Sequence, residues 1–191
     1  IGTGMIGGKA MGMLVARSIL ERDAPDIAAL LEPHDSFFVG SDVFYTYMVE
    51  NGCWWEWQAQ KERIDEPSEE ASLRRRILEG SFPQYIVQRF SDLLAYFGDS
   101  PVIVRSSSLL EDSYGNAFSG KYDSVFSVNQ GSPSARLAAF LEAIRHIYAG
   151  AISSEALEYR KRRGVLDRDE QMAILVQRVS GKRHGHFFFP H

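Results

Sequence analysis

The sequence is poor in cysteine, in proline and in long apolar runs. Its 191 residues include one cysteine, Cys53, so an internal disulfide is excluded and a reducing compartment, which we take to be the cytoplasm, is expected. No apolar run approaches the ~20 residues of a membrane span, and no cleavable signal pattern is recognised. The formal net charge of -4 gives no overall attraction to nucleic acid or acidic lipid. A phosphate site would therefore need a local cluster of cations and backbone N–H groups.

The composition is that of an ordinary globular protein, with 45% apolar and 24% charged residues. Helical patterns dominate the first half and strand patterns the second, which predicts an α+β fold. We expect a glycine-loop and helical subdomain over residues 1–98 and a strand–loop–strand subdomain over residues 99–191. The first residue is not methionine and the last segment reads as a strand, so we expect a piece of a longer polypeptide.

Periodicity and capping residues predict the individual elements. Helices are expected over 9–22, 26–31, from Ser41 or Asp42 through Val49, from Ser68 onward, over 82–97, from Ser132 or Ser134, and over 154–163. Strands are expected over 36–40, 102–105, 122–128 and 172–179. A turn at Ser180–Lys182 should lead to an apolar segment, 187–189, and the tryptophans at 54, 55 and 57 should form an aromatic cluster in the core or at a domain contact.

The segment from Val102 to Ser124 is the most informative part of the chain. A β-branched strand ends on Arg105, a polar loop with two glycines follows, and an alternating strand returns. A guanidinium beside hydroxyls and backbone N–H groups suits a polyphosphate. The plainer interpretation is a structural arginine paired with Glu111 or Asp112, followed by turn serines.

The glycine-rich start has three interpretations. Residues 2–7 fit G-x-G-x-x-G, but the strand that precedes this fingerprint in a dinucleotide-binding fold is missing, so a Rossmann oxidoreductase is disfavoured. The P-loop pattern is not met, because Gly8-Lys9 is followed by alanine. A lysine in the first turn of a helix, such as Lys9, is mildly unfavourable because the helix N-terminus is itself positive. Either a bound anion offsets this positive charge, or Lys9 is simply solvated.

Four segments together resemble one known family. They are Arg105-Ser-Ser with Glu111-Asp, Phe118-Ser-Gly and Ser124; Gly7-Gly8-Lys9; the Ser-x-x-Ala-x-x-Tyr-Arg pattern ending at Arg160; and the strand over 172–179. In this order they are similar to the nucleotide-binding domain of phosphoenolpyruvate synthase and pyruvate phosphate dikinase. The resemblance implies an ATP-grasp-like lobe that binds ATP with Mg²⁺. The residues it implies are Lys9 and Arg105 at the phosphates as catalytic cations, with Ser106, Gly120, Ser124 and Gln177 as further ATP contacts.

The resemblance also implies partners in the same full-length chain. The phosphate would pass to a carrier histidine on another domain, and a further domain would bind phosphoenolpyruvate or pyruvate. The metal-holding acids of the family would lie beyond His191, so this chain alone should bind ATP weakly and catalyse nothing. A non-catalytic nucleotide-binding module of the same fold is the alternative. His184, His186 and His191 lack the ligand spacing of a metal site, and the phosphoryl acceptor stays open.

Overall fold

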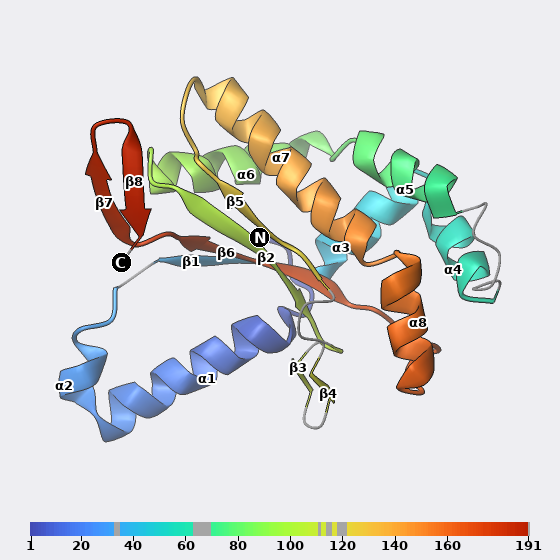
Figure 1. Ribbon diagram of the computed structural model, residues 1–191, viewed down its shortest axis with the longest axis horizontal. Coiled ribbons are helices and arrows are strands. Elements are labelled where there is room, and N and C mark those ends of the chain that lie inside the picture. Colours follow the sequence, from blue (N-terminus) through green and yellow to red (C-terminus); the bar gives the residue numbers. More distant parts are fainter. Residues whose placement is uncertain (33–34, 63–69, 111, 114–115, 118–121, 191) are drawn as a thin grey trace.

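The computed structural model describes the chain except residues 33–34, 63–69, 111, 114–115, 118–121 and 191. Its centre is a four-stranded antiparallel sheet in the order β1-β6-β2-β5 (Figure 1). The strands are β1 (Ser36–Val39), β2 (Val102–Ser108), β5 (Ser124–Ser127) and β6 (Met172–Arg178). Two hairpins pair β3 (Asp112–Ser113) with β4 (Asn116–Ala117) and β7 (Gly181–His184) with β8 (Phe187–Pro190).

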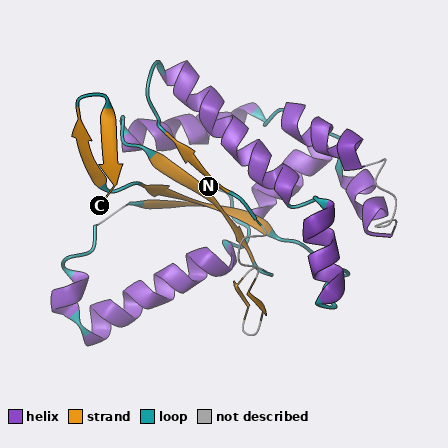
Figure 2. Ribbon diagram, in the orientation of Figure 1, coloured by secondary structure: helices purple, strands orange, loops and turns teal. Residues whose placement is uncertain are grey.

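Helices cover both faces of the sheet, and the predicted α+β class is confirmed. They are α1 (Gly7–Asp23), α2 (Pro25–Ala28), α3 (Ser41–Glu50), α4 (Trp54–Glu62), α5 (Glu70–Glu79), α6 (Gln84–Phe97), α7 (Pro133–Gly150) and α8 (Ser154–Arg162). Figure 2 shows α1 on one side of the sheet and α3, α6 and α7 on the other. None of the described helices is both long enough and apolar enough to cross a membrane.

The two predicted segments are joined by the sheet. Strand β1, from residues 1–98, pairs with β6, from residues 99–191. The apolar core lies between the sheet and the larger group of helices, where aromatic rings meet edge to face. Phe44, for example, packs against Trp57 and Tyr148 with ring centroids 5.4 and 5.0 Å apart. The division into 1–98 and 99–191 stays a prediction.

Capping serines explain where two of the helices begin. The Ser132 hydroxyl accepts a hydrogen bond from the Ala135 N–H at 3.2 Å, so Ser132 rather than Ser134 caps α7. Ser153 caps α8 through the Ala156 N–H at 3.3 Å. Because both serines precede amphipathic helices, the sequence predicts these starts well.

Three expectations need correction. The predicted turn at Ser180–Lys182 is wrong: β7 begins at Gly181, and the hairpin turns at Gly185, where φ is +62°. The residue that caps α3 is Gly40, and the Ser41 and Asp42 side chains bind the N-terminal loop instead. The tryptophan cluster is confirmed for Trp54 and Trp57, whose ring centroids lie 5.5 Å apart, but not for Trp55, which is 80% exposed on α4.

Candidate functional site

Polar residues of three strands lie on the side of the sheet that α1 covers, here called the α1 face. The Gln177 amide nitrogen donates to Met13 Sδ of α1 at 3.4 Å, which fixes the direction of Gln177. Gln177 is the register partner of Ile103, and Arg105 lies two residues further along β2. Because side chains alternate along a strand, Arg105 shares this face, as does its own partner Ser124 in β5.

The Arg105 side chain is incompletely satisfied. Its Nη1 donates to Gln177 Oε1 at 3.4 Å, a long hydrogen bond. Its Nε is buried and has no hydrogen-bond partner, and Arg105 forms no ion pair within the described part of the chain. A buried donor without an acceptor costs about 1–3 kcal/mol, and a phosphate oxygen is an acceptor that would remove this cost. The alternative partners, Glu111 and the Asp112 side chain, lie outside the described residues.

The start of α1 is fastened to β2 next to Arg105. The Ser107 hydroxyl accepts from the Ala10 N–H at 3.1 Å and donates to the Ile6 carbonyl at 2.7 Å. Gly7 has φ +77°, and a Cβ there would stand 1.4 Å from the Ser107 carbonyl oxygen. The close approach therefore requires glycine at this position, which gives the Gly-Gly-Lys segment a structural reason.

Lys9 belongs to the same face. It is half-buried and lies one helical turn before Met13, which contacts Gln177, so both side chains project from the same side of α1. The next residue, Ala10, is bound to Ser107, which is two residues from Arg105 in β2 and therefore on the same face of the sheet. The two predicted cations are thus brought to one side of the sheet from segments almost 100 residues apart.

One other predicted residue, Ser106, does not lie on the α1 face. Ser106 alternates with Arg105, so its side chain lies on the opposite face with Val104, and it is 1% exposed. Gly120 lies outside the described residues. Ser107 instead faces α1, a role that the sequence could not distinguish from that of Ser106 without the register of β2.

The glycine loop before α1 is already engaged by the protein. The Asp42 carboxylate accepts hydrogen bonds from the Thr3 and Gly4 N–H groups, both at 2.9 Å. The Ser41 hydroxyl accepts from the Met5 N–H at 3.2 Å. A dinucleotide pyrophosphate would need these same N–H groups, so the geometry disfavours the Rossmann interpretation.

Comparison with known protein families covers almost the whole chain, including the residues of the α1 face. Residues 3–187 match the family model described as pyruvate phosphate dikinase, AMP/ATP-binding domain. The chain belongs to this family. The resemblance found in the sequence is thereby confirmed, and ATP is supported as the ligand.

A curated relative is the rifampicin phosphotransferase of Streptomyces sviceus. It is 31% identical over 110 residues, which are 57% of this chain and 12% of the relative. The matched segment is thus a small part of the relative's length. Its name describes a phosphotransferase, which agrees with an ATP-binding role in a phosphotransferase family.

The structure also shows a buried polar group that sequence reasoning missed, here called the Glu170 network: Ser108, Tyr122, Arg160 and Glu170. The Ser108 hydroxyl donates to Glu170 Oε1, and the Tyr122 hydroxyl donates to Glu170 Oε2 at 2.7 Å. Arg160 Nε lies 3.0 Å from Glu170 Oε2 and 3.2 Å from the Tyr122 hydroxyl. Arg160 and Glu170 are both fully buried.

The electrostatics of this network keep Tyr122 protonated. Burial, and then the nearby Glu170 charge, raise the pKa of Tyr122 well above its ordinary value. The hydroxyl therefore stays a donor to the carboxylate over the physiological range. In the sequence the one signal was the family's Tyr-Arg pattern at Arg160, to which no role could be assigned; nothing marked Glu170.

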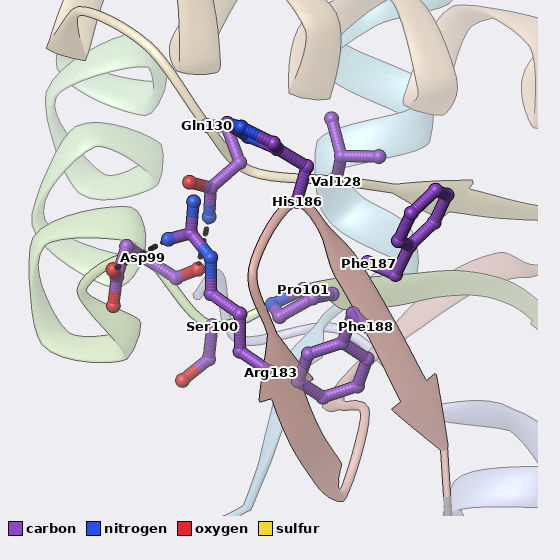
Figure 3. A pocket seen from close by; sticks show the side chains of 9 residues that line it. All are labelled: Asp99, Ser100, Pro101, Val128, Gln130, Arg183, His186, Phe187 and Phe188. Carbon is purple, nitrogen blue, oxygen red and sulfur yellow. Dashed lines mark hydrogen bonds and ion pairs between the residues drawn. The ribbon is translucent and has the colours of Figure 1, made fainter.

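A separate cavity of about 430 Å³ lies between the β7–β8 hairpin and the segments that flank β2 and β5 (Figure 3). It is lined by Asp99, Ser100, Pro101, Val128, Gln130, Arg183, His186, Phe187 and Phe188. The described residues predicted to bind ATP are not among them. His184 packs against the Phe189 ring, with centroids 5.6 Å apart. Over the described ranges, no three histidine, cysteine or carboxylate side chains gather as metal ligands.

Proposed function

We propose that the α1 face binds the phosphates of ATP in an ATP-dependent phosphotransferase related to phosphoenolpyruvate synthase and pyruvate phosphate dikinase. One observation carries the proposal: Arg105 Nε is a buried donor that finds no acceptor among the described residues, and it lies on the face that also holds Lys9. A desolvated guanidinium of this kind suits an anionic oxygen, and ATP, one of the two nucleotides named for the family, supplies three phosphates.

Each predicted residue has a role in this proposal. Lys9 and Arg105 supply positive charge to the terminal phosphates, and the Ser124 hydroxyl bonds a phosphate oxygen. Gln177 would stand on the base side. Its hydrogen bonds to Met13 and Ser36 connect β6 to α1 and β1. Gly120 and Ser106 are included because the family resemblance implies them, Ser106 with its side chain on the opposite face.

Little covalent chemistry would fall to this part of the protein. Phosphoryl transfer depends mainly on positioning and on stabilising charge, which fixed cations on a rigid sheet provide. We place the chain as one lobe of an ATP-grasp-like domain in the cytoplasm. Mg²⁺ would come with the nucleotide and offset the negative charge of its phosphates, since the described residues hold no cluster of three metal ligands. A carrier histidine and a phosphoenolpyruvate- or pyruvate-binding domain of the full-length chain would take the phosphate onward.

The decisive experiment is a titration of the full-length protein with ATP and Mg²⁺. Replacing Arg105 with alanine should weaken ATP binding by about 10- to 100-fold, since hydrogen bonds to charged groups contribute about 1.5–3 kcal/mol. The matched control is Arg75→Ala, an exposed arginine of α5, a helix that carries none of the proposed site residues, and this variant should bind ATP as the parent does. Equal affinities of parent and Arg105→Ala would contradict the proposal.

The same titration separates the rival functions. Binding that depends on Arg105, without ATP consumption by the full-length protein, would identify a non-catalytic nucleotide-binding module. Binding of NAD that does not depend on Arg105 would point to the dinucleotide alternative, which the engagement of Thr3 and Gly4 by Asp42 already disfavours.

A further inference from the structure

The Glu170 carboxylate connects two strands at the place where they leave the sheet. Ser108 is the last residue of β2, and Tyr122 precedes the start of β5 by two residues. One carboxylate oxygen accepts from Ser108 and the other from Tyr122. A single side chain therefore joins the two ends of the β2–β5 connection, which carries the β3–β4 hairpin.

The residues proposed to bind phosphate lie directly beside this junction. Arg105 and Ser124 form the last paired position of the β2–β5 ladder. Beyond it, the Ser106 N–H donates to the Asp123 carbonyl in a long backbone hydrogen bond of 3.5 Å. The end of a ladder opens more easily than its middle. The relative position of Arg105 and Ser124 therefore depends on what holds the strands together beyond them.

We propose that Glu170 and Arg160 are positioning residues for the phosphate site: through Ser108 and Tyr122 they fix the Arg105–Ser124 end of the β2–β5 ladder. Arg160 orients the carboxylate, with its Nε 3.0 Å from Glu170 Oε2. Its Nη2 donates to the Ala151 carbonyl, so the network is anchored to the turn between α7 and α8. This inference rests on the proposed function, because it assigns the purpose of the network to ATP binding.

Stability alone is a weak reason for such a network. Exchanging a buried ion pair for apolar side chains of similar volume is often neutral or even stabilising, whereas removing one partner is strongly destabilising. What hydrogen-bonded charges provide and apolar contacts do not is a fixed direction for each bonded group. Replacing both charges together therefore separates a role in stability, which such a change can leave intact, from a role in positioning, which it removes.

The test uses the double variant Arg160→Met with Glu170→Leu in the full-length protein. The variant should remain folded and bind ATP at least about tenfold more weakly. The Ser106 amide hydrogen, which donates across this end of the ladder to the Asp123 carbonyl, should exchange faster than in the parent. The amides of Val102 and Ser127, at the other end of the same ladder, should exchange as before. The control is Ile147→Val, a core change in α7, which should leave both the ATP affinity and the ladder unchanged.

A second variant removes one hydroxyl only. Tyr122→Phe keeps the buried ring and both charges but loses the hydrogen bond to Glu170, so it should weaken ATP binding by a smaller factor, about threefold, with the same faster exchange. This variant decides the matter if the double variant does not fold.

The inference is overturned if folded variants bind ATP as the parent does, or if exchange at the Arg105–Ser124 end is unchanged. Should the parent itself fail to bind ATP, the proposed function fails, and the exchange measurement alone then judges whether the network fixes the ladder. The inference is also contradicted if the double variant and Ile147→Val have the same free energy of unfolding and lose ATP affinity by the same factor.

Discussion

Arg105 shows how much a single residue type can indicate. A guanidinium carries five N–H donors, and the described residues offer it one acceptor, the Gln177 side chain. An arginine that served only the fold would be expected to pair with a carboxylate. Arg105 instead keeps a donor without an acceptor among the described residues, on the face that it shares with Lys9. This favours binding of a ligand over a purely structural role.

Tyr47 gives a prediction about pH at the same scale. Burial raises the pKa of Tyr47 to about 12, and its hydroxyl donates to the Ile77 carbonyl at 2.6 Å. Between about pH 10 and 12 the unfolded chain ionises this tyrosine while the folded chain does not, so stability present below pH 10 is lost as the pH rises. The free energy of unfolding, measured in urea from pH 8 to 11, should fall above pH 10.

The control for this prediction is Tyr47→Phe, which cannot ionise at that position. Its unfolding free energy should fall less steeply above pH 10 than that of the parent. A slope identical to the parent's would show that Tyr47 does not contribute to the alkaline loss of stability.

At the scale of elements, the contact of α1 with β2 depends on Gly7. Alanine there should lower the free energy of unfolding by about 1–3 kcal/mol, because its Cβ meets the Ser107 carbonyl and the backbone is at positive φ. Gly12→Ala is the matched control in the same helix, since a Cβ at Gly12 meets nothing within 4 Å. It should stabilise by roughly 0.5–1 kcal/mol. Equal effects of the two changes in urea unfolding would contradict this account of the contact.

Local sequence signals predict many of the helices and strands, and the wrong prediction near Gly181 also has a local cause. Ser132 and Ser153 precede helices, and the β-branched run before Arg105 reads as a strand without further information. The polar residues Ser180–Lys182 predict a turn, whereas strand β7 covers Gly181–His184. In the fold it is a hairpin strand whose polar side chains are exposed, so burial never selected an apolar pattern.

Parts of the site could not be predicted because they depend on register. Whether Ser106 or Ser107 faces α1 is decided by the alternation of β2, which a run of three serines does not show. The Glu170 network joins residues from four separate segments, and no spacing in the sequence relates them. The family resemblance identified Arg160 without its purpose, and the structure supplies its partners.

At the scale of the whole molecule, the chain provides cations and a rigid sheet, and the proposal leaves the remaining chemistry to other domains. The isolated 191-residue chain, given ATP and Mg²⁺, should release no phosphate or ADP above the buffer rate. The full-length protein is the control and should consume ATP under the same conditions. Turnover by the isolated chain would show that the catalytic groups are already within it.

The most direct test of the central claim compares two ligands that differ only in their phosphates. The full-length protein and its Lys9→Met and Arg105→Ala variants are titrated with ATP and with adenosine. If both cations act on the phosphates, each variant loses about tenfold or more in ATP affinity while its adenosine affinity stays that of the parent. A variant that weakens ATP and adenosine by the same factor, or that keeps the parent's preference for ATP, would contradict the account.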